Sequence, residues 1–426
     1  MVFNIHNKIK CYTSIFKNNP TYFKSLLNKK LLSIGSMFFV VILSPFTIHF
    51  VVLIRLLKPF YIIRFGHLES EGIGHFSQSV EIYLAEVECG IHSTHRVLDM
   101  WYLNKIVCNK VLEKKWSEKL IIVPRMFKFV HMLNKIFPGS HVHEIPYRYI
   151  SDQNTPWQVI DVNEVLHKTK PNIIFNDEEK NQCVKILIDA GFDVKRKFVC
   201  LSVRDGGFHN DAIISGHRNS SVNDYVDSIQ YLNQLGYQVV RIGAEPSEKL
   251  TIHGPLIFDY SFSGIRSEIL DLFLISECQF LVGTGSGIDV VTTLFRKPQV
   301  YLNIIEISFL SWYSYNSIII LKKYQMINGE ILSLSNIYKN HYDKFTLAYE
   351  FDESGITLIK NTNEEIEAAL FEMHSRINDT WEVKPHDDEL QELVKSYWPN
   401  EPQRGNITAK IGADFLRSNP QLLKVA

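Results

Sequence analysis

The stretch VGTGSGIDVVTTLFRKPQVYLN, residues 282–303, contains a short apolar run, a glycine-rich turn, a helix-length segment and a second apolar run after Pro298. This order predicts a strand, a turn, a helix and a strand. Glycines let a backbone approach a ligand closely, and the start of a helix presents unpaired N–H groups to anions. We therefore expect the turn to hold a phosphate group, although such turns can also serve only to pack a helix on a strand. The turn consists of Gly283, Thr284, Gly285, Ser286 and Gly287.

Short apolar runs alternate with helical stretches on the N-terminal side of this turn, which favours an α/β fold with parallel sheets. We expect strands at 61–63, 97–100, 120–123, 198–203, 238–242 and 280–282. Helices are expected at 76–88, 105–114, 177–190, 223–235 and 267–278. Thr362 and Glu365 have the spacing of a capping box, which predicts a helix from there to about Ser375, and 386–398 predicts another.

Composition excludes some classes of protein. The chain has 426 residues, is 46% hydrophobic and carries a formal net charge of -1, so no overall charge bias favours nucleic acid as a partner. The six cysteines include no Cys-x-x-Cys pair, which fits neither a zinc site nor a disulfide framework and favours a reducing compartment.

The N-terminal region contains an uncharged apolar run from Leu31 to Ile54. At about 1.5 Å per helical residue it is long enough to cross a bilayer core of roughly 30 Å. Basic residues flank it on both sides and the first acidic residue is Glu69, so the positive-inside rule draws both ends to the cytoplasm. Pro45 and His49 suit a hairpin that enters one leaflet and returns. We expect an anchor on the cytoplasmic face of the inner membrane, with a single spanning helix or a buried core helix as alternatives.

The domain organisation expected from these patterns has four parts. Residues 1–58 form the basic N-terminus and anchor, and 59–170 form a first α/β lobe. Residues 171–380 form a second α/β lobe, and 381–426 form a helical segment that braces the lobes.

Ligands of open α/β sheets bind beyond the carboxyl ends of the strands, so the loops after the strands are the places to look for chemistry. In the first lobe the loop 66–76 offers His75 with two carboxylates, Glu69 and Glu71. An imidazole with an ordinary pKa near 6.5 can deprotonate an acceptor hydroxyl at neutral pH. His75 can equally be a helix cap or a packing residue.

Basic residues follow the strands of the second lobe. Arg204 follows the strand at 198–203, Arg241 ends the strand at 238–242, and His217 and Arg218 lie between them. Guanidinium groups bind phosphate in a bidentate manner and stay charged. Together these side chains can neutralise a diphosphate leaving group, although a single arginine is more often part of an ion pair. The loops contain no clear Asp-x-Asp, so neither a metal nor a cofactor besides a nucleotide-sugar co-substrate is expected.

The motifs GIGHF with EIYLAE, LSVRDGGF with GHRN, YQVVRIGA, and the run from Ser267 to Asn303 together resemble a group of bacterial glycosyltransferases of unassigned specificity, associated with surface-polysaccharide synthesis. The similarity covers about 60–420 and includes the C-terminal ITAKIGADFLRSNPQLL. It is specific as a set rather than motif by motif.

This resemblance implies a GT-B enzyme with two Rossmann-like lobes, of which 59–170 is the acceptor-side lobe and 171–380 binds the nucleotide-sugar. It further implies that Arg204 and the turn from Gly283 to Gly287 contact the donor diphosphate, and that His75, Glu71 or Glu69 supplies the base. The expected function is metal-independent transfer of a sugar to a membrane-associated surface glycan, with a role in lipopolysaccharide or another surface polysaccharide. A sugar-nucleotide 2-epimerase of the same fold and a non-catalytic glycan-binding or assembly protein are the alternatives.

Overall fold

The computed structural model describes residue 24 and residues 42–92, 95–145, 160–207, 216–399 and 404–424. The chain forms two compact units. Unit 1 comprises 1–68, 93–105 and 117–147, and unit 2 comprises 69–92, 106–116 and 148–426. The chain therefore passes between the units repeatedly before it stays in unit 2. The four domains expected from the sequence stay predictions.

Unit 1 contains a small parallel sheet of β1 (Ile62–Leu68), β2 (Val97–Leu103) and β3 (Ile121–Ile122), in that order. A helix at 42–57, α5 (Phe127–Asn134) and η2 (Ser140–His143) accompany it. Val51 and Ile54 of the first helix are buried with Phe65 of β1 and with Val130 and Leu133 of α5. This apolar cluster attaches the helix to the sheet.

β1 is longer than the predicted strand, because it includes Gly66 and His67, which were expected to be loop. A Cβ atom on Gly66 would lie 2.6 Å from the Trp101 ring, so glycine is required here to let the buried indole pack on the strand. The strand therefore continues to Leu68, and the loop that carries Glu69 and His75 begins only after it.

The expected membrane segment lies partly outside the described residues, since 31–41 are not among them. Across the described part of the chain, we find no helix with both the length and the apolar character needed to cross a bilayer. The membrane anchor stays a prediction.

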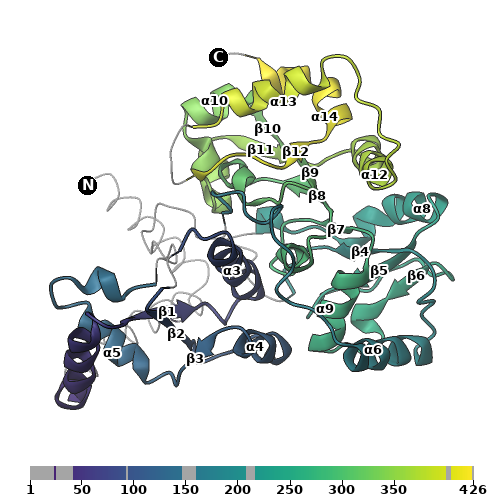
Figure 1. The fold of residues 1–426 in the computed structure, drawn as a ribbon. Coiled ribbons are helices and arrows are strands. Elements are labelled where there is room, and N and C mark those ends of the chain that lie inside the picture. The colour runs from purple at the N-terminus through teal and green to yellow at the C-terminus, as the bar shows by residue number, and fades with distance from the viewer. Residues whose placement is uncertain are drawn as a thin grey trace. The chain divides into compact units, whose positions relative to one another are not determined.

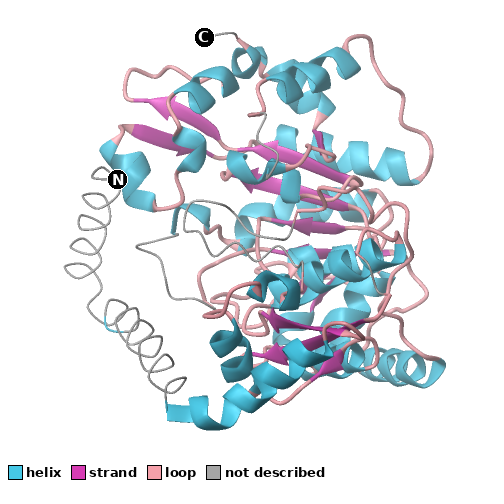
Figure 2. Cartoon of the chain, turned by 60° about the vertical axis from the view of Figure 1, so that its left-hand side comes forward, coloured by secondary structure: helices cyan, strands magenta, loops and turns pink. Residues whose placement is uncertain are grey.

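Unit 2 is built on a seven-stranded sheet whose strands all pair in parallel, in the order β12-β9-β8-β7-β4-β5-β6 (Figures 1 and 2). Its strands are β4 (Phe198–Ser202), β5 (Gln238–Ile242), β6 (Ile257–Asp259), β7 (Leu281–Gly283), β8 (Gln299–Ile304), β9 (Ser317–Leu321) and β12 (Lys410–Ile411). Counted along the chain from β4 to β9, this is the doubly wound order 3-2-1-4-5-6, which reverses direction between β4 and β7. A second, antiparallel sheet consists of β10 (Lys323–Met326) and β11 (Ile356–Ile359).

Helices cover this sheet in two groups (Figure 1). In one, α8 (Val226–Gln234) and α12 (Asn363–Ile377) contact each other and the strands β5, β8 and β9. In the other, α9 (Glu268–Glu277) contacts α6 (Asp177–Asp189) and η6 (Asp289–Phe295). Because both faces are covered, β4, β5, β7 and β8 are buried along their whole length, as is typical of parallel sheets.

Shorter helical elements complete the two units. Along the chain, η1 (His75–Ser79) and α3 (Val80–Glu88) come between β1 and β2, and α4 (Lys110–Ser117) comes between β2 and β3. The remaining elements are η3 (Gly216–Arg218), η4 (Val222–Tyr225), η5 (Tyr260–Phe262), η7 (Ile307–Trp312), α10 (Leu334–Lys339), η8 (Tyr342–Lys344), α11 (Ala348–Glu353), α13 (Asp387–Ser396), α14 (Ala413–Ser418) and η10 (Pro420–Leu423).

The expectation of a mixed α/β fold with parallel sheets is confirmed. The capping box is confirmed as well: Thr362 accepts from the Glu365 amide, and the Glu365 side chain accepts from the Thr362 amide. The helix predicted at 105–114 is wrong at its start, because α4 begins at Lys110. The side chain of Asn109 accepts a hydrogen bond from the Leu112 amide and so caps the helix there.

The helix expected after the glycine-rich turn is present, but it is not an α-helix. This segment is the seven-residue 3-10 helix η6. Its sequence DVVTTLF is rich in β-branched residues, which disfavour an α-helix, and Arg296 ends it in the left-handed conformation at φ 55°.

Candidate functional site

The glycine-rich turn after β7 is closed by the side chain of Asp289. The amides of Gly285 and Ser286 donate to Asp289 Oδ2 at 2.9 and 2.7 Å, and the Ser286 hydroxyl donates to Oδ1 at 2.8 Å. Asp289 is fully buried, which raises its pKa, while its hydrogen bonds with Ser202, Ser286 and Gly285 act to lower the pKa. The amides of Gly285 and Ser286, which were expected to bind a phosphate, therefore bind the carboxylate of Asp289.

Gly283 and Thr284 also fix the conformation of the turn. A Cβ atom on Gly283 would lie 2.5 Å from Asp289 Oδ2, so only glycine leaves room for the carboxylate. The Thr284 hydroxyl accepts a hydrogen bond from the Arg204 amide at 2.8 Å, which ties the loop after β4 to the loop after β7. Gly285 has φ +83°, a conformation that favours glycine.

The loop that carries His75 packs directly on this turn, within unit 2. A Cβ atom on Gly74 would lie 2.9 Å from Val290 Cγ2 and 3.3 Å from the Gly287 carbonyl oxygen. Glycine at this position therefore allows the two loops to touch. Two stretches about 200 residues apart in the sequence become neighbours in this way.

His75 begins η1 and is half-buried. Burial lowers the pKa of its imidazole below 6.5, and the charge of Glu69 acts in the opposite direction. The imidazole is therefore mostly neutral at pH 7 and can accept a proton.

A cavity of about 590 Å³ opens beyond the carboxyl ends of β4, β5, β7 and β8. Its position matches the general rule that ligands of doubly wound sheets bind where the strand order reverses, here between β4 and β7 (Figure 1). Its size is within the usual range for small-molecule sites. The lining comes from seven stretches of unit 2: 71–78, 108–109, 202–206, 218, 242–246, 266–271 and 285–313.

Seven of the residues singled out from the sequence line this cavity: His75, Glu71, Arg204, Arg218, Gly285, Ser286 and Gly287. Glu69, Gly283 and Thr284 are not among its lining residues; Glu69 acts on His75 through its charge, and the other two lie behind the turn.

Two predicted donor-binding residues are directed elsewhere. Arg241 is buried, with Nη1 3.2 Å from Asp259 Oδ1 and Nη2 3.8 Å from Asp205 Oδ2, and its guanidinium lies over the Phe262 ring. The His217 ring packs against Phe351. Neither residue lines the cavity.

Arg218 reaches the cavity with its charge already balanced. Its Nε lies 2.7 Å from Glu306 Oε1, and Nη2 donates to the Gly285 carbonyl oxygen at 2.7 Å. Arg218 therefore fixes the turn from the side opposite Asp289. The backbone of Arg204 is held between Thr284 and the Ser220 amide, which donates to its carbonyl oxygen at 2.8 Å.

Several lining residues were not predicted from the sequence. Glu306, Phe309 and Trp312 follow β8, and the Phe309 and Trp312 rings stack with centroids 4.1 Å apart and planes 10° apart. Arg266 and Asp271, which precede or lie in α9, form an ion pair of 2.7 Å. The rule of searching strand ends, applied to β8, would have found the first group.

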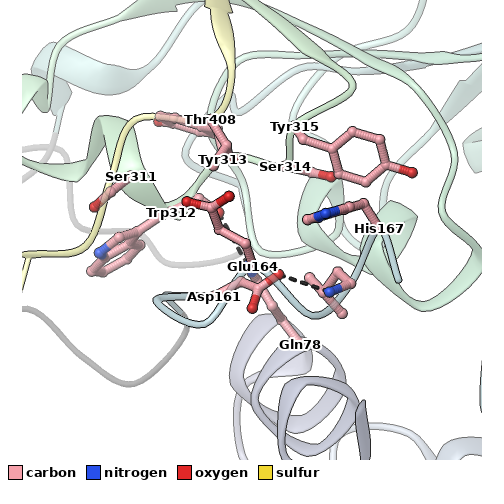
Figure 3. A pocket seen from close by; sticks show the side chains of 11 residues that line it. Gln78, Asp161, Glu164, His167, Ser311, Trp312, Tyr313, Ser314, Tyr315 and Thr408 are labelled. Atoms are coloured by element: carbon pink, nitrogen blue, oxygen red, sulfur yellow. Dashed lines mark hydrogen bonds between the residues drawn. The ribbon is translucent and has the colours of Figure 1, made fainter. Parts of the chain in front are cut away.

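A much smaller niche adjoins the cavity and shares Gln78, Trp312 and Tyr313 with it (Figure 3). Its volume of about 10 Å³ suits one water molecule. Asp161 lies in its lining, and its two carboxylate oxygens accept from the Val165 and Leu166 amides. The niche is too small for a substrate.

A search of the described residues for groups of three or more His, Cys, Asp or Glu with the geometry of a metal site gives none. The donor set of the cavity is instead one of arginines, carboxylates and one imidazole.

Comparisons with known proteins give weak similarities. No family model matches the chain, and no curated protein matches it. The solved structures with some likeness are glycosyltransferases.

Three of these matches show how distant the similarity is. ADP-heptose lps heptosyltransferase II of E. coli is 12% identical, with a TM-score of 0.38 over 61% of this chain and 90% of that chain. The family 9 glycosyl transferase of Veillonella parvula is 12% identical, with a TM-score of 0.37 over 62% of this chain and 86% of that chain. The E. coli heptosyltransferase WaaC with ADP-2-deoxy-2-fluoro heptose is 11% identical, with a TM-score of 0.31 over 68% of this chain and 99% of that chain. Because these TM-scores lie below 0.5, we derive no functional argument from them.

Replacement of Asp289 by asparagine is expected to destabilise unit 2. Asparagine has one acceptor oxygen in place of two and no negative charge, so it cannot accept at both carboxylate positions, and the loss of a buried hydrogen bond costs about 1–3 kcal/mol. Urea unfolding of Asp289→Asn measures this, with Asp189→Asn on the exposed surface of α6 as the matched control. Equal stability of the two variants would contradict the role of Asp289.

Proposed function

We propose that this protein is a glycosyltransferase that moves a sugar from a nucleotide-sugar donor to a membrane-associated surface-glycan acceptor. The observation that carries the proposal is the convergence of His75, Arg204, Arg218 and the glycine-rich turn on one cavity of unit 2. The chemistry requires a base for the acceptor, which His75 supplies, and positive charge for the leaving group, which Arg204 supplies, while Arg218 holds the turn in place.

In the proposed reaction the acceptor hydroxyl oxygen attacks the anomeric carbon of the donor sugar. His75 takes the hydroxyl proton, and the bond from the anomeric carbon to the diphosphate oxygen breaks. Arg204 stabilises the charge that the diphosphate gains, a kind of electrostatic contribution that typically dominates such catalysis. Arg218 holds the turn, since its own charge is paired with Glu306.

The doubly wound sheet of unit 2 supports the assignment of a Rossmann-like nucleotide lobe, with the diphosphate close to the β4–β7 switch point. In this proposal unit 1 contributes to a second, acceptor-side lobe, as in GT-B enzymes. The acceptor is a surface glycan on a lipid carrier, and the protein works on the cytoplasmic face of the inner membrane. Catalysis without a metal belongs to the proposal too, with arginine in the place of a divalent cation.

Loss of Arg204 is expected to abolish binding of the nucleotide. A nucleotide at about 100 times its dissociation constant should stabilise the wild-type chain by roughly 2.7 kcal/mol. The measurement is a thermal-shift screen with ADP, UDP, GDP, CMP and their sugar conjugates, on wild type, Arg204→Ala and the control Arg196→Ala, which removes an exposed arginine of the same unit.

Three results would contradict the proposal, one from this screen and two from assays of nucleotide-sugar conversion and of glycan binding. An equal shift for wild type and Arg204→Ala would remove Arg204 from the donor site. Interconversion of a bound nucleotide-sugar without any acceptor would favour the 2-epimerase, and glycan binding without nucleotide binding would favour the assembly protein.

The pH profile should carry the signature of His75. Because burial lowers its pKa, the acidic limb of kcat/KM is expected below pH 6.5. Glu69→Gln removes a charge that raises this pKa, so the limb should move to still lower pH. His75→Gln should lower the rate about 10²–10⁴-fold and abolish the limb. A limb that stays at the same pH in all three proteins would exclude His75 as the base.

A further inference from the structure

Unit 1 and unit 2 carry opposite charge. Over 1–68, 93–105 and 117–147 the sequence has 15 Lys and Arg against 3 Asp and Glu, a net charge of +12 for unit 1. The whole chain has 45 Lys and Arg against 46 Asp and Glu. Unit 2 therefore has the remaining 30 basic and 43 acidic residues, a net charge of -13. The near-neutral total therefore conceals a strongly basic unit.

Much of this positive charge lies at the surface of unit 1. The exposed basic residues among its described ranges include Lys58, Arg96, Lys105, Lys119, Arg125 and Lys135. No acidic residue occurs in 42–68 or in 119–143. Anionic surfaces attract such segments with about 1 kcal/mol for each Lys or Arg close to them.

The helix at 42–57 adds an apolar surface to the basic one. Its inner side chains Val51 and Ile54 are buried against the sheet and α5. Large side chains outside this contact stay exposed, although they are apolar: Phe46 72%, Phe50 48%, Leu53 50%, Leu56 69% and Phe60 67%. The spacing of three or four residues places Phe46, Phe50, Leu53 and Leu56 along one side of the helix, and Phe60 lies in the turn just after it.

We propose that this face of unit 1, defined as Phe46, Phe50, Leu53, Leu56 and Phe60 and continued by the exposed Lys58, docks into the surface of an anionic lipid bilayer, to which the positive charge of the unit attracts it. Apolar side chains enter the boundary between headgroups and acyl chains, and the basic residues contact the headgroups. A nucleic acid would use the charge and can stack bases on phenyl rings, but it has no apolar interior for Leu53 and Leu56, which is why the bilayer is the better partner.

The way the chain enters this helix supports the same partner. The uncharged run that begins at Leu31 continues into the helix at residue 42, and the lysines before it add to the positive charge. The described helix thus lies where a basic, apolar N-terminal segment joins the folded unit. This inference does not depend on the reaction proposed for unit 2.

The test is flotation of the full-length chain, translated in the presence of vesicles, with phosphatidylcholine alone or mixed with phosphatidylglycerol. The test variant is Phe46→Ser, Phe50→Ser and Leu53→Ser combined. The matched control combines Ile327→Ser, Phe371→Ser and Val383→Ser, three exposed apolar residues of unit 2. Lys58→Glu with Arg125→Glu tests the charge.

Wild type and control should float with anionic vesicles. The apolar variant should bind these vesicles at least about tenfold more weakly than wild type. The charge variant should lose the preference for phosphatidylglycerol. Circular dichroism and thermal unfolding of each variant report whether it is folded, separately from docking.

Undiminished flotation of the apolar variant would overturn the proposal, as would equal binding of wild type to neutral and anionic vesicles. A self-association that the apolar variant loses, with unchanged flotation, would assign the face to a second copy of the chain instead. Binding to RNA or DNA in preference to vesicles would also overturn it.

Discussion

The candidate site depends on the hydrogen bonds that the buried carboxylate of Asp289 makes with the glycine-rich turn. It accepts hydrogen bonds from two consecutive amides of the glycine-rich turn and from the Ser286 hydroxyl. From the other side, Arg218 binds the Gly285 carbonyl oxygen and is itself held by Glu306. An internal anion and an internal cation thus fix the shape of a turn whose glycines would otherwise leave it mobile.

The fixed turn organises the loops around it. Thr284 holds the backbone of Arg204, and the absence of a side chain on Gly74 lets the His75 loop lie against the turn. A neutral imidazole and a guanidinium therefore line the same cavity at the point where the strand order of unit 2 reverses. Preorganisation of this kind is what stabilisation of a charged leaving group needs, because little has to move when the charge develops.

The sequence predicts those features that depend on local patterns. Buried strands such as β4 and β5 appear as apolar runs, and the Thr362–Glu365 box marks the start of α12. The start of α4 depends on the Asn109 cap, which the apolar pattern does not show, and the β-branched run after the turn limits that segment to the short 3-10 helix η6.

The site residues show where local patterns fail. The sequence cannot separate Arg204, which lines the cavity, from Arg241, because the partners of Arg241 come from distant positions, Asp205 and Asp259. Likewise it does not reveal that Asp289 folds back onto the amides of its own turn. Glu306, Phe309 and Trp312 enter the cavity only because β8 lies beside β7.

The most direct test of the central claim, that the cavity of unit 2 holds the donor diphosphate, is hydrogen–deuterium exchange with and without the stabilising nucleotide. The account predicts slower exchange in the loops after β4, β5 and β7, at 203–206, 243–246 and 284–288. Protection confined to other parts of the chain, with these loops unchanged while the nucleotide is bound, would contradict it.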